Sequence, residues 1–287
     1  RACVMGVIPI LIAWPALAAV ILPLVRSRKA RAAVVYTAAA GMMALAAVLL
    51  AAWLSAGKQT LFLAPESIYT NYLDLAMLAG EFVLMGLIIA LSIRHRKYPV
   101  ILLSAGQTLL VAWSEIFHPV EKTTHMRVDG LAMLLCIIAA FVGGFICIYA
   151  VGYMKAYHEH HKEYKDRSGF FFSMLFLFLA AMFGLVLSEN LVWMYFFWEV
   201  TSVVSFLLIG YTRTEEAVNN SFRALWMNLL GGFGFAAAIV YMAWNYGVVQ
   251  LAEVIAIAPA IPVALLAFAA LTKSPQLPFS YWLLGAM

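Results

Sequence analysis

The sequence has little charge. Lys, Arg, Asp and Glu make up 11% of its 287 residues, and hydrophobic residues make up 65%. Soluble domains contain about a quarter charged residues, so this composition excludes the ordinary soluble class. The mean hydropathy of +0.94 is typical of a helical membrane protein. We expect a multi-pass protein of the cell (inner or plasma) membrane that has the lipid bilayer as its surroundings.

Cysteine is scarce as well. Cys3, Cys136 and Cys147 are the three cysteines, and no C-x-x-C spacing occurs, which indicates neither a disulfide framework nor a metal site. The sequence contains no glycine-rich phosphate loop, haem ligand pair or nucleophile elbow, so a membrane-embedded enzyme is not favoured. The net charge of +4 lies mostly in short loops. It therefore indicates membrane topology, and we expect no nucleic-acid partner.

Long apolar runs predict an all-α polytopic membrane protein with about nine transmembrane helices, because a span needs about 20 apolar residues. We expect the first run to be a true span and not a cleaved signal. The run Phe170–Tyr211 is long enough for two helices, which we expect to be hinged at 188–190. The other predicted spans are 5–24, 32–54, 75–93, 100–117, 131–154, 221–246 and 261–284.

The loops between these runs predict the topology. Cations crowd the loops at 26–31, 94–97 and 155–167, and Arg213 follows the hinged pair. All of these loops fall on one side when the N-terminus is placed outside. Lys and Arg are enriched in cytoplasmic loops, so this side is predicted to be the cytoplasm.

Glu199 lies about ten residues into the second helix of the hinged pair, near the expected centre of the hydrocarbon region. A carboxylate at this depth costs several kcal/mol and is by default a functional-site hypothesis. The alternative is an acid that only packs between helices and is hydrogen-bonded to a neighbouring Ser or Thr.

Lys273 lies about twelve residues into the last predicted span and is followed by Pro275 and Pro278. Proline removes a helix donor, so we expect this helix to be broken at Pro275/Pro278. Broken membrane helices occur where the freed backbone meets protein or water, and transporters place ion sites there. The alternative is a lysine that reaches the interface from a kinked helix.

Two further charged residues are weaker candidates. Arg223 follows Asn219-Asn220-Ser221 near the predicted start of its helix, where it could act as a fixed positive field or only as a topology signal. Glu81 is a lone acid two turns into its predicted helix. We expect Asp74 and Asp129, which precede apolar runs, to cap helices, and the histidines of 158–161 to lie in a solvated loop.

Several motifs occur in a fixed order in the second part of the chain. They are Arg127-Val-Asp-Gly-Leu-Ala-Met-Leu-Leu135, Tyr149-Ala-Val-Gly-Tyr-Met154, Leu187-Ser-Glu-Asn-Leu191, Trp198-Glu199, Leu207-Leu-Ile-Gly-Tyr211, Thr272-Lys-Ser-Pro-Gln-Leu-Pro-Phe-Ser-Tyr-Trp282 and Ala286-Met287. This set resembles the antiporter-like subunits of respiratory complex I, with NADH-quinone oxidoreductase subunit L as the nearest type. The same family includes membrane subunits of energy-converting hydrogenases and of Mrp sodium/proton antiporters.

The resemblance implies that the chain has two regions and that it translocates protons. Residues 127–287 resemble the first part of an antiporter-like domain of inverted repeats, and residues 1–126 match it only in being hydrophobic. In the family, the glutamate of the Trp-Glu motif pairs with a lysine on a neighbouring helix, and the lysine of the Lys-Ser-x-Gln-x-Pro motif carries the proton relay. Those positions are Glu199 and Lys273 here. Withdrawal of Glu199 would then favour release of the proton from Lys273.

Two departures from the family pattern matter. Arg223 stands roughly where relatives commonly carry a second lysine, so it is an electrostatic stand-in and not a proton carrier. Family members also continue through a second inverted repeat, which the resemblance does not cover here.

The leading hypothesis is a proton-translocating subunit of a redox-driven complex of the NADH:quinone oxidoreductase or energy-converting hydrogenase type. No cofactor is expected in this chain. Iron–sulfur, flavin or nickel–iron centres would belong to peripheral redox subunits, and other membrane subunits would complete the assembly. The alternatives are an Mrp-type Na+/H+ antiporter subunit and a non-conducting structural membrane anchor.

Overall fold

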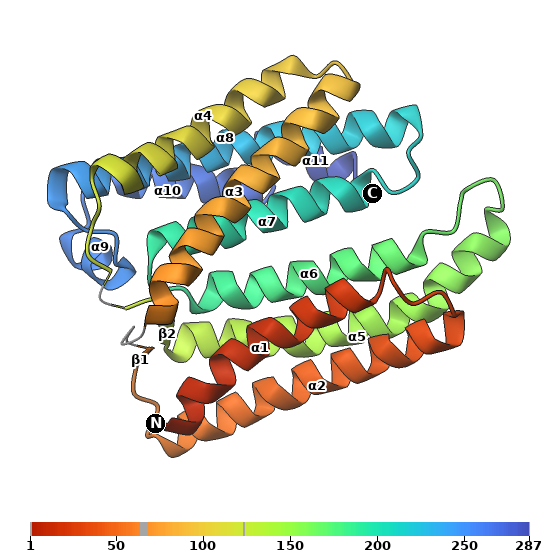
Figure 1. Cartoon of the computed structure of the whole chain (residues 1–287), viewed down its shortest axis with the longest axis horizontal. Coiled ribbons are helices and arrows are strands. Elements are labelled where there is room, and N and C mark those ends of the chain that lie inside the picture. Colours follow the sequence, from red (N-terminus) through yellow and green to blue (C-terminus); the bar gives the residue numbers. More distant parts are fainter. Residues whose placement is uncertain (1, 64–67, 123, 287) are drawn as a thin grey trace. The chain divides into compact units, whose positions relative to one another are not determined.

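The computed structural model describes residues 2–63, 68–122 and 124–286 of the chain (Figure 1). Pro65 and Glu66 of the predicted outer loop, and Met287 of the last motif, lie outside the described residues. The chain divides into two compact units that are interleaved in the sequence. Unit 1 consists of Arg1–Leu63 and Arg127–Leu187, and unit 2 of Ala64–Met126 and Ser188–Met287.

Unit 1 is a bundle of four helices. Each helix packs against two others, in the cyclic order α1, α2, α5, α6. A two-stranded sheet of β1 and β2 accompanies the bundle. The elements are α1 (Ala2–Ile21), α2 (Arg28–Ser55), β1 (Leu61–Leu63), β2 (Met126–Val128), α5 (Gly130–His160) and α6 (Ser168–Leu187).

Unit 2 is organised around α8, which packs against α4, α7 and α10, while α3 packs against α4 and α7. The elements are α3 (Ile68–Arg94), α4 (Tyr98–Phe117), α7 (Leu191–Ile209), α8 (Glu215–Tyr246), α9 (Leu251–Ile257), α10 (Ala260–Lys273) and α11 (Tyr281–Leu284). The central position of α8 follows from its small residues, because glycine and alanine let neighbouring helix backbones approach closely.

Local sequence signals define several helix ends. The side chains of Asp129, Asn190 and Thr214 accept hydrogen bonds from backbone N–H groups in the first turns of α5, α7 and α8. These are N-caps, which satisfy donors that have no partner within the helix. The Asn190 cap places the break between α6 and α7 at 188–190, as predicted.

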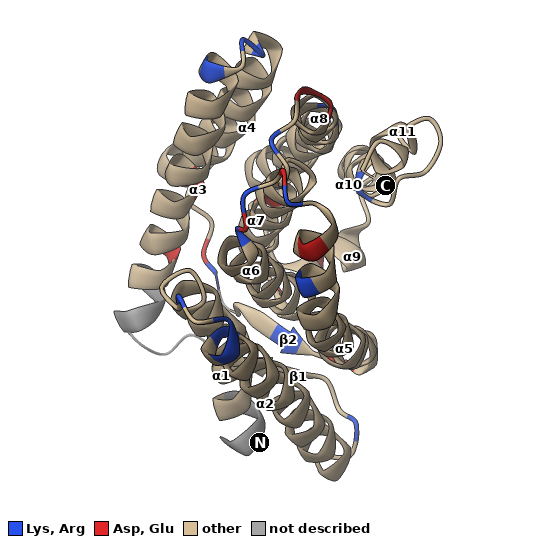
Figure 2. Ribbon diagram, turned by 90° about the vertical axis from the view of Figure 1, so that its right-hand side faces the viewer, with Lys and Arg blue, Asp and Glu red and all other residues tan. Residues whose placement is uncertain are grey.

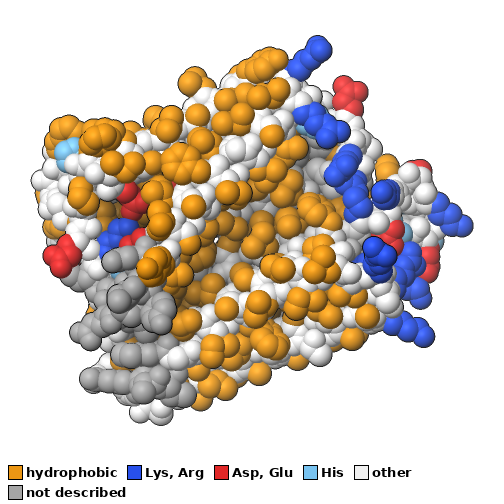
Figure 3. Space-filling model, viewed as in Figure 1, with side chains coloured by type: hydrophobic (Ala, Val, Ile, Leu, Met, Phe, Trp, Pro, Cys, Tyr) orange, Lys and Arg blue, Asp and Glu red, His pale blue; other side chains and the backbone are white. Residues whose placement is uncertain are grey.

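Seven helices of the described residues are long and apolar enough to cross a membrane: α2, α3, α4, α5, α6, α7 and α8. The first and last predicted spans correspond to shorter apolar helices, Gly6–Ile21 and Ala260–Lys273. The prediction of an all-α polytopic membrane protein is therefore confirmed. Hydrophobic side chains cover the sides of the helices on the face shown in Figure 3. Charged residues are few and lie mostly near helix ends (Figure 2).

Within each unit, segments that were predicted to lie on the same side of the membrane lie at the same end. In unit 1, the ion pair of Arg28 with Asp166 (2.9 Å) joins the start of α2 to the loop after α5, so two cation-rich segments share one end. In unit 2, Lys97 Nζ donates to Asn219 Oδ1 (3.0 Å) and joins the start of α4 to the first turns of α8. The positive-inside rule predicts that both ends face the cytoplasm.

Some predicted boundaries were wrong. Helix α8 begins at Glu215, six residues before the predicted start, because Thr214 caps it and two acids of its first turn favour a helix N-terminus. Helix α5 continues to His160, so two of the loop histidines are helical. Asp74 does not cap a helix, since it lies within α3. Helix α9 and both strands were not expected.

Candidate functional site

Glu199 is the ninth residue of α7 and is 4% exposed. Its Oε2 accepts a hydrogen bond of 2.7 Å from the Nε2 amide of Gln107 on α4. Its Oε1 is buried and has no hydrogen-bond partner among the residues that the structure describes. The carboxylate therefore has one fixed partner and one open position, which a proton or a water molecule can occupy.

Gly232 of α8 makes room for this pair. A Cβ atom at Gly232 would lie 2.6 Å from both Glu199 Oε1 and Gln107 Oε1. No side chain larger than hydrogen fits there without moving the carboxylate or the amide. The neighbouring Gly231 has the same role on the α10 side, where a Cβ would overlap the hydroxyl of Thr272. The glycine pair thus lets α8 approach Glu199 on one face and the end of α10 on another.

Lys273 is the last residue of α10 and is partly buried. Its Nζ donates a 2.7 Å hydrogen bond to Ser202 Oγ and lies 3.4 Å from the carbonyl oxygen of Trp198. The ammonium also lies 5.1 Å from the centroid of the Trp198 ring, within the range of a cation–π interaction. These contacts hold Lys273 against the turn of α7 that carries Glu199. Within the described part of the chain, no ion pair of 4 Å or less joins the two residues directly.

The chain leaves its helical path directly after Lys273, as the two prolines predicted. Residues 274–280 are not helical, and the short α11 follows. The carbonyl of Thr272, left without a helical partner by the break, accepts a hydrogen bond of 3.0 Å from the indole N–H of Trp282. A protein group therefore satisfies the carbonyl that the break frees, as is required for irregular backbone inside a membrane.

Glu81 on α3 is 4% exposed, and its Oε2 has no hydrogen-bond partner among the described residues. Its electrostatic neighbours are Glu115, Glu199 and Lys122. The approach of α3 to α7 is close here, since a Cβ at Gly80 would lie 2.8 Å from the ring of Phe196. The structure therefore brings Glu81 into the same buried interior as Glu199.

Arg223 has different surroundings. Its NH1 donates to Asn220 Oδ1 at 3.4 Å, and its guanidinium carbon lies 4.5 Å from the centroid of the Tyr281 ring. Along α8 it precedes Gly232 by nine residues, or roughly 13 Å at the helical rise. The structure thus places Arg223 beside α11 and not beside Glu199.

Sequence reasoning missed the residues that surround the charged pair. The sequence alone did not predict that Gln107 or the glycine pair Gly231-Gly232 belongs to the site. A buried amide in an apolar run is itself a signal, because such a group needs a partner at the same depth. No sequence signal identified Ser202, which is one of several hydroxyl residues on α7. Over the described residues, no group of three or more His, Cys, Asp or Glu is arranged to hold a metal ion.

Comparison with known families finds two matches. Residues 188–287 match the family described as "NADH:quinone oxidoreductase/Mrp antiporter, TM". Residues 113–165 match the family described as "NADH-Ubiquinone oxidoreductase (complex I), chain 5 N-terminus". The first match contains α7, α8 and α10, which carry Glu199, the glycine pair and Lys273.

Curated relatives give a consistent picture. The Na(+)/H(+) antiporter subunit A1 of Staphylococcus haemolyticus is 32% identical over 192 residues, which cover 64% of this chain and 23% of the relative. The subunit of the same name from a Staphylococcus aureus strain is 32% identical over 171 residues, covering 56% and 20%. The chain thus spans less than a quarter of the length of these relatives.

A chain of the membrane-bound sulfane sulfur reductase, an archaeal respiratory membrane complex, has a similar structure. The TM-score is 0.66 at 14% sequence identity, over 98% of this chain and 47% of that chain. At this identity the likeness shows the fold alone.

Proposed function

Because the chain belongs to the antiporter-like family of complex I and Mrp membrane subunits, we propose that it translocates protons through the buried polar interior of unit 2. The observation that carries the proposal is the placement of Glu199 and Lys273 on adjoining turns of α7 and α10. Gln107 donates a hydrogen bond to the Glu199 carboxylate, and Ser202 accepts one from the Lys273 ammonium. The two charged groups lie on neighbouring turns, so the charge of one affects the protonation of the other.

Glu199 would alternate between two protonation states. Ionised, it is stabilised by the amide of Gln107. Protonated, it would carry its proton on Oε1, the oxygen that has no partner among the described residues. In a low-dielectric interior a carboxyl group without a compensating charge favours the neutral form, so the charge state of Lys273 would decide which form prevails.

Lys273 would be the proton carrier at the helix break. Ser202 Oγ and the Trp198 carbonyl accept from its ammonium, so the charged form is solvated by protein groups. A lysine can release its proton when a neighbouring charge changes, whereas a guanidinium cannot. Arg223 would therefore contribute a fixed field only.

The proposal also covers what drives proton movement and which subunits assemble with this chain. Coupling to a redox reaction, with peripheral redox subunits and other membrane subunits as partners, is the hypothesis that the motifs first suggested. The second candidate is Mrp-type exchange of Na+ for protons. It is supported by the relatives at 32% identity, which are named Na(+)/H(+) antiporter subunits.

The assembled complex in everted membrane vesicles tests the proposal. Proton movement is followed with a fluorescent pH indicator after addition of an electron donor and, separately, of Na+. We expect Glu199→Gln and Lys273→Ala to reduce transport to background while the complex assembles normally. Transport near the wild-type rate in both variants would overturn the proposal and favour the structural anchor.

A conservative variant separates a proton carrier from a fixed charge. Lys273→Arg keeps the positive charge but cannot give up a proton. If Lys273 carries protons, this variant loses transport as Lys273→Ala does. Retained transport in Lys273→Arg would show that only the charge is needed. Glu253→Gln, an exposed acid of α9 outside the polar interior, is the matched control.

A further inference from the structure

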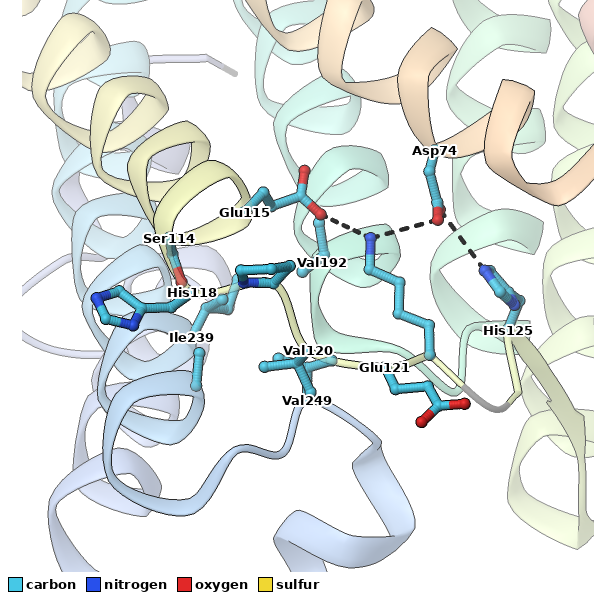
Figure 4. A pocket seen from close by; sticks show the side chains of 13 residues that line it. Asp74, Ser114, Glu115, His118, Val120, Glu121, His125, Val192, Ile239 and Val249 are labelled. Carbon is cyan, nitrogen blue, oxygen red and sulfur yellow. Dashed lines mark hydrogen bonds and ion pairs between the residues drawn. The ribbon is translucent and has the colours of Figure 1, made fainter.

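Unit 2 contains a cavity of about 380 Å³ at the end of the unit opposite its cation-rich loops (Figure 4). It is lined by the end of α4, by residues 118–122, by His125, and by parts of α3, α7 and α8. Asp74, Glu115, His118, Lys122 and His125 give it a polar wall. One water needs about 10–15 Å³ of such volume, so the cavity has room for several waters.

The charged side chains of this wall form a connected cluster. Lys122 Nζ lies 2.6 Å from Glu115 Oε1 and 3.4 Å from Asp74 Oδ2. His125 Nε2 lies 3.6 Å from Asp74 Oδ1, and the indole N–H of Trp193 donates to the same carboxylate. Figure 4 shows the Glu115 and Asp74 carboxylates on either side of the dashed ion pairs, with His125 beside Asp74.

The environment of His125 suggests that the cavity contains water. It is 5% exposed, and neither ring nitrogen has a hydrogen-bond partner among the described residues. Buried polar groups are almost always hydrogen-bonded, and a polar contact longer than 3.5 Å commonly contains a water. The ring lines the cavity beside Asp74, so cavity water can reach its nitrogens.

Polar residues of α4 lie on the buried face of the helix between the cavity and Glu199. Ser114 lines the cavity, and Gln107 and Thr108 lie about two turns back along the helix, with the buried Val111 between them. Glu115 is eight residues from Gln107, or roughly 12 Å along the helix. Gln107 is the hydrogen-bond partner of Glu199.

Glu81 on α3 is a buried carboxyl group between Glu199 and the cavity. It lies seven residues beyond Asp74 on α3, or roughly 10 Å from the cavity along the helix. Its electrostatic neighbours include both Glu115 and Glu199. Two buried carboxyl groups and the cavity cluster thus follow one another from Glu199 to the end of unit 2.

We infer that this cavity is the outer aqueous port of the proton path, and that Glu115 passes protons between the cavity water and Glu81. This inference rests on the proposed function and assigns a role to a second site. A proton leaving Glu199 is taken by the Glu81 carboxylate and then by Glu115, and cavity water accepts it.

Thiol labelling tests the port without relying on transport. In the assembled complex, Cys3, Cys136 and Cys147 are replaced by Ser, and Val120 of the cavity wall is changed to Cys. A charged, membrane-impermeant methanethiosulfonate is applied to vesicles of either orientation. We expect Val120→Cys to react from the outside only. No reaction from either side, or reaction from the cytoplasmic side only, would overturn the inference.

Two matched positions calibrate the labelling. Leu109→Cys lies on the exposed flank of α4, 55% exposed outside the cavity, and should remain unreactive in lipid. Lys97→Cys, at the cation-rich end of the same helix, should react from the cytoplasmic side. If Leu109→Cys reacts as fast as Val120→Cys, the cavity is not a distinct aqueous site.

Transport then tests the relay. We expect Glu115→Gln and Glu81→Gln each to lower proton transport at least about tenfold, equivalent to 1.4 kcal/mol, with normal assembly. Glu253→Gln should leave it unchanged. If Glu199→Gln abolishes transport while both Glu115→Gln and Glu81→Gln retain it, the port is wrong and the proposed function stands. If Glu199→Gln retains transport, the proposed function fails, whatever the labelling shows.

Discussion

The two units of this protein have similar helices and very different interiors. In unit 1, Ser168 and Ser173 are the buried polar side chains among the described residues. In unit 2, the membrane-spanning helices bury many more. They are Glu81, Ser92, Ser104, Gln107, Thr108, Ser114, Glu199, Thr201, Ser202, Ser221 and Asn228.

The difference separates what holds the fold together from the interior that we propose as the proton path. Unit 1 relies on apolar packing, and Ser173 donates its hydroxyl hydrogen to the carbonyl of Ala19 on a neighbouring helix. Unit 2 buries groups that cost free energy unless they are paired, and it leaves oxygens of Glu81 and Glu199 without described partners. Ionisable residues inside membrane spans are functional candidates by default, which is why we place the proposed proton path in unit 2.

Both units use glycine for close helix contacts, but the contacts differ. A Cβ at Gly143 of unit 1 would meet the end of the Leu179 side chain, which can move. A Cβ at Gly232 of unit 2 would meet Oε1 of Glu199 and Oε1 of Gln107, whose side chains are held by the hydrogen bond between Gln107 Nε2 and Glu199 Oε2.

The largest expected effect is on the stability of unit 1. Phe176 of α6 is completely buried. Truncation of a buried Phe costs about 3–5 kcal/mol, so we expect Phe176→Ala to lower the thermal stability of the purified protein strongly. Transport per assembled molecule should remain at the wild-type level. A loss of transport in correctly assembled protein would contradict the assignment of the path to unit 2.

The next effect concerns the glycines. Gly232→Ala should displace the Glu199–Gln107 pair and reduce transport about tenfold or more, with an overpacking cost of about 1–3 kcal/mol. Gly143→Ala should be tolerated, because the Leu179 side chain can adopt another rotamer. Proton transport and assembly are measured for both. Equal transport in the two variants would show that the contact at Gly232 has no special role.

A smaller effect is expected at Gln107. Gln107→Leu removes the donor to Glu199 and leaves a buried carboxylate oxygen unpaired, at a cost of about 1–3 kcal/mol. We expect transport to fall and its pH profile to shift, since the ionised form of Glu199 loses its hydrogen bond. Asn245→Ala, which removes an exposed amide near the end of α8, is the control and should leave the profile unchanged. An unchanged profile in Gln107→Leu would mean that this bond does not tune Glu199.

The smallest effect is at the cation-rich end of unit 1. Partial burial alone would raise the pKa of Asp166, but hydrogen bonds from the hydroxyl and amide of Ser168 and from Arg28 lower it to about 2. The ionised form is therefore favoured by folding. Its contribution is fully present above the ordinary pKa near 3.8 and disappears as the pH falls through about 2.

Asp166→Asn should therefore be less stable than the wild type near neutral pH, by less than about 1 kcal/mol because the side chain is partly exposed. The difference should vanish at the acid end of this window. Melting temperatures measured across pH provide the check. A difference that persists unchanged below pH 2 would show that the loss does not come from the carboxylate charge.

Much of the fold could be predicted because its signals are local. Apolar runs of sufficient length identified the seven long spans, and the residues at 188–190 identified the break between α6 and α7. The prolines after Lys273 identified the end of α10. Helix ends outside the apolar runs, such as Glu215 of α8, were missed because capping decides them and hydropathy does not.

The candidate site could be predicted only in part. Glu199 and Lys273 were identified from their depth in apolar runs, and their role in proton transfer remains a prediction. Asp74 was expected to cap a helix, but it pairs with Lys122, which is distant in the sequence. Such pairings depend on which helix faces are brought together, and single-sequence patterns do not contain that information.

By itself the sequence determined the membrane class, the seven long spans and the two charged residues in apolar runs, and it predicted which helix ends face the cytoplasm. These follow from hydrophobicity and charge, which act residue by residue against lipid and water. Only the tertiary structure decided that Gln107 holds Glu199, that Ser202 holds Lys273, and that Glu115 and Lys122 share a cavity. These contacts join helices far apart in the chain, and close packing around α8 is what brings them within hydrogen-bonding distance.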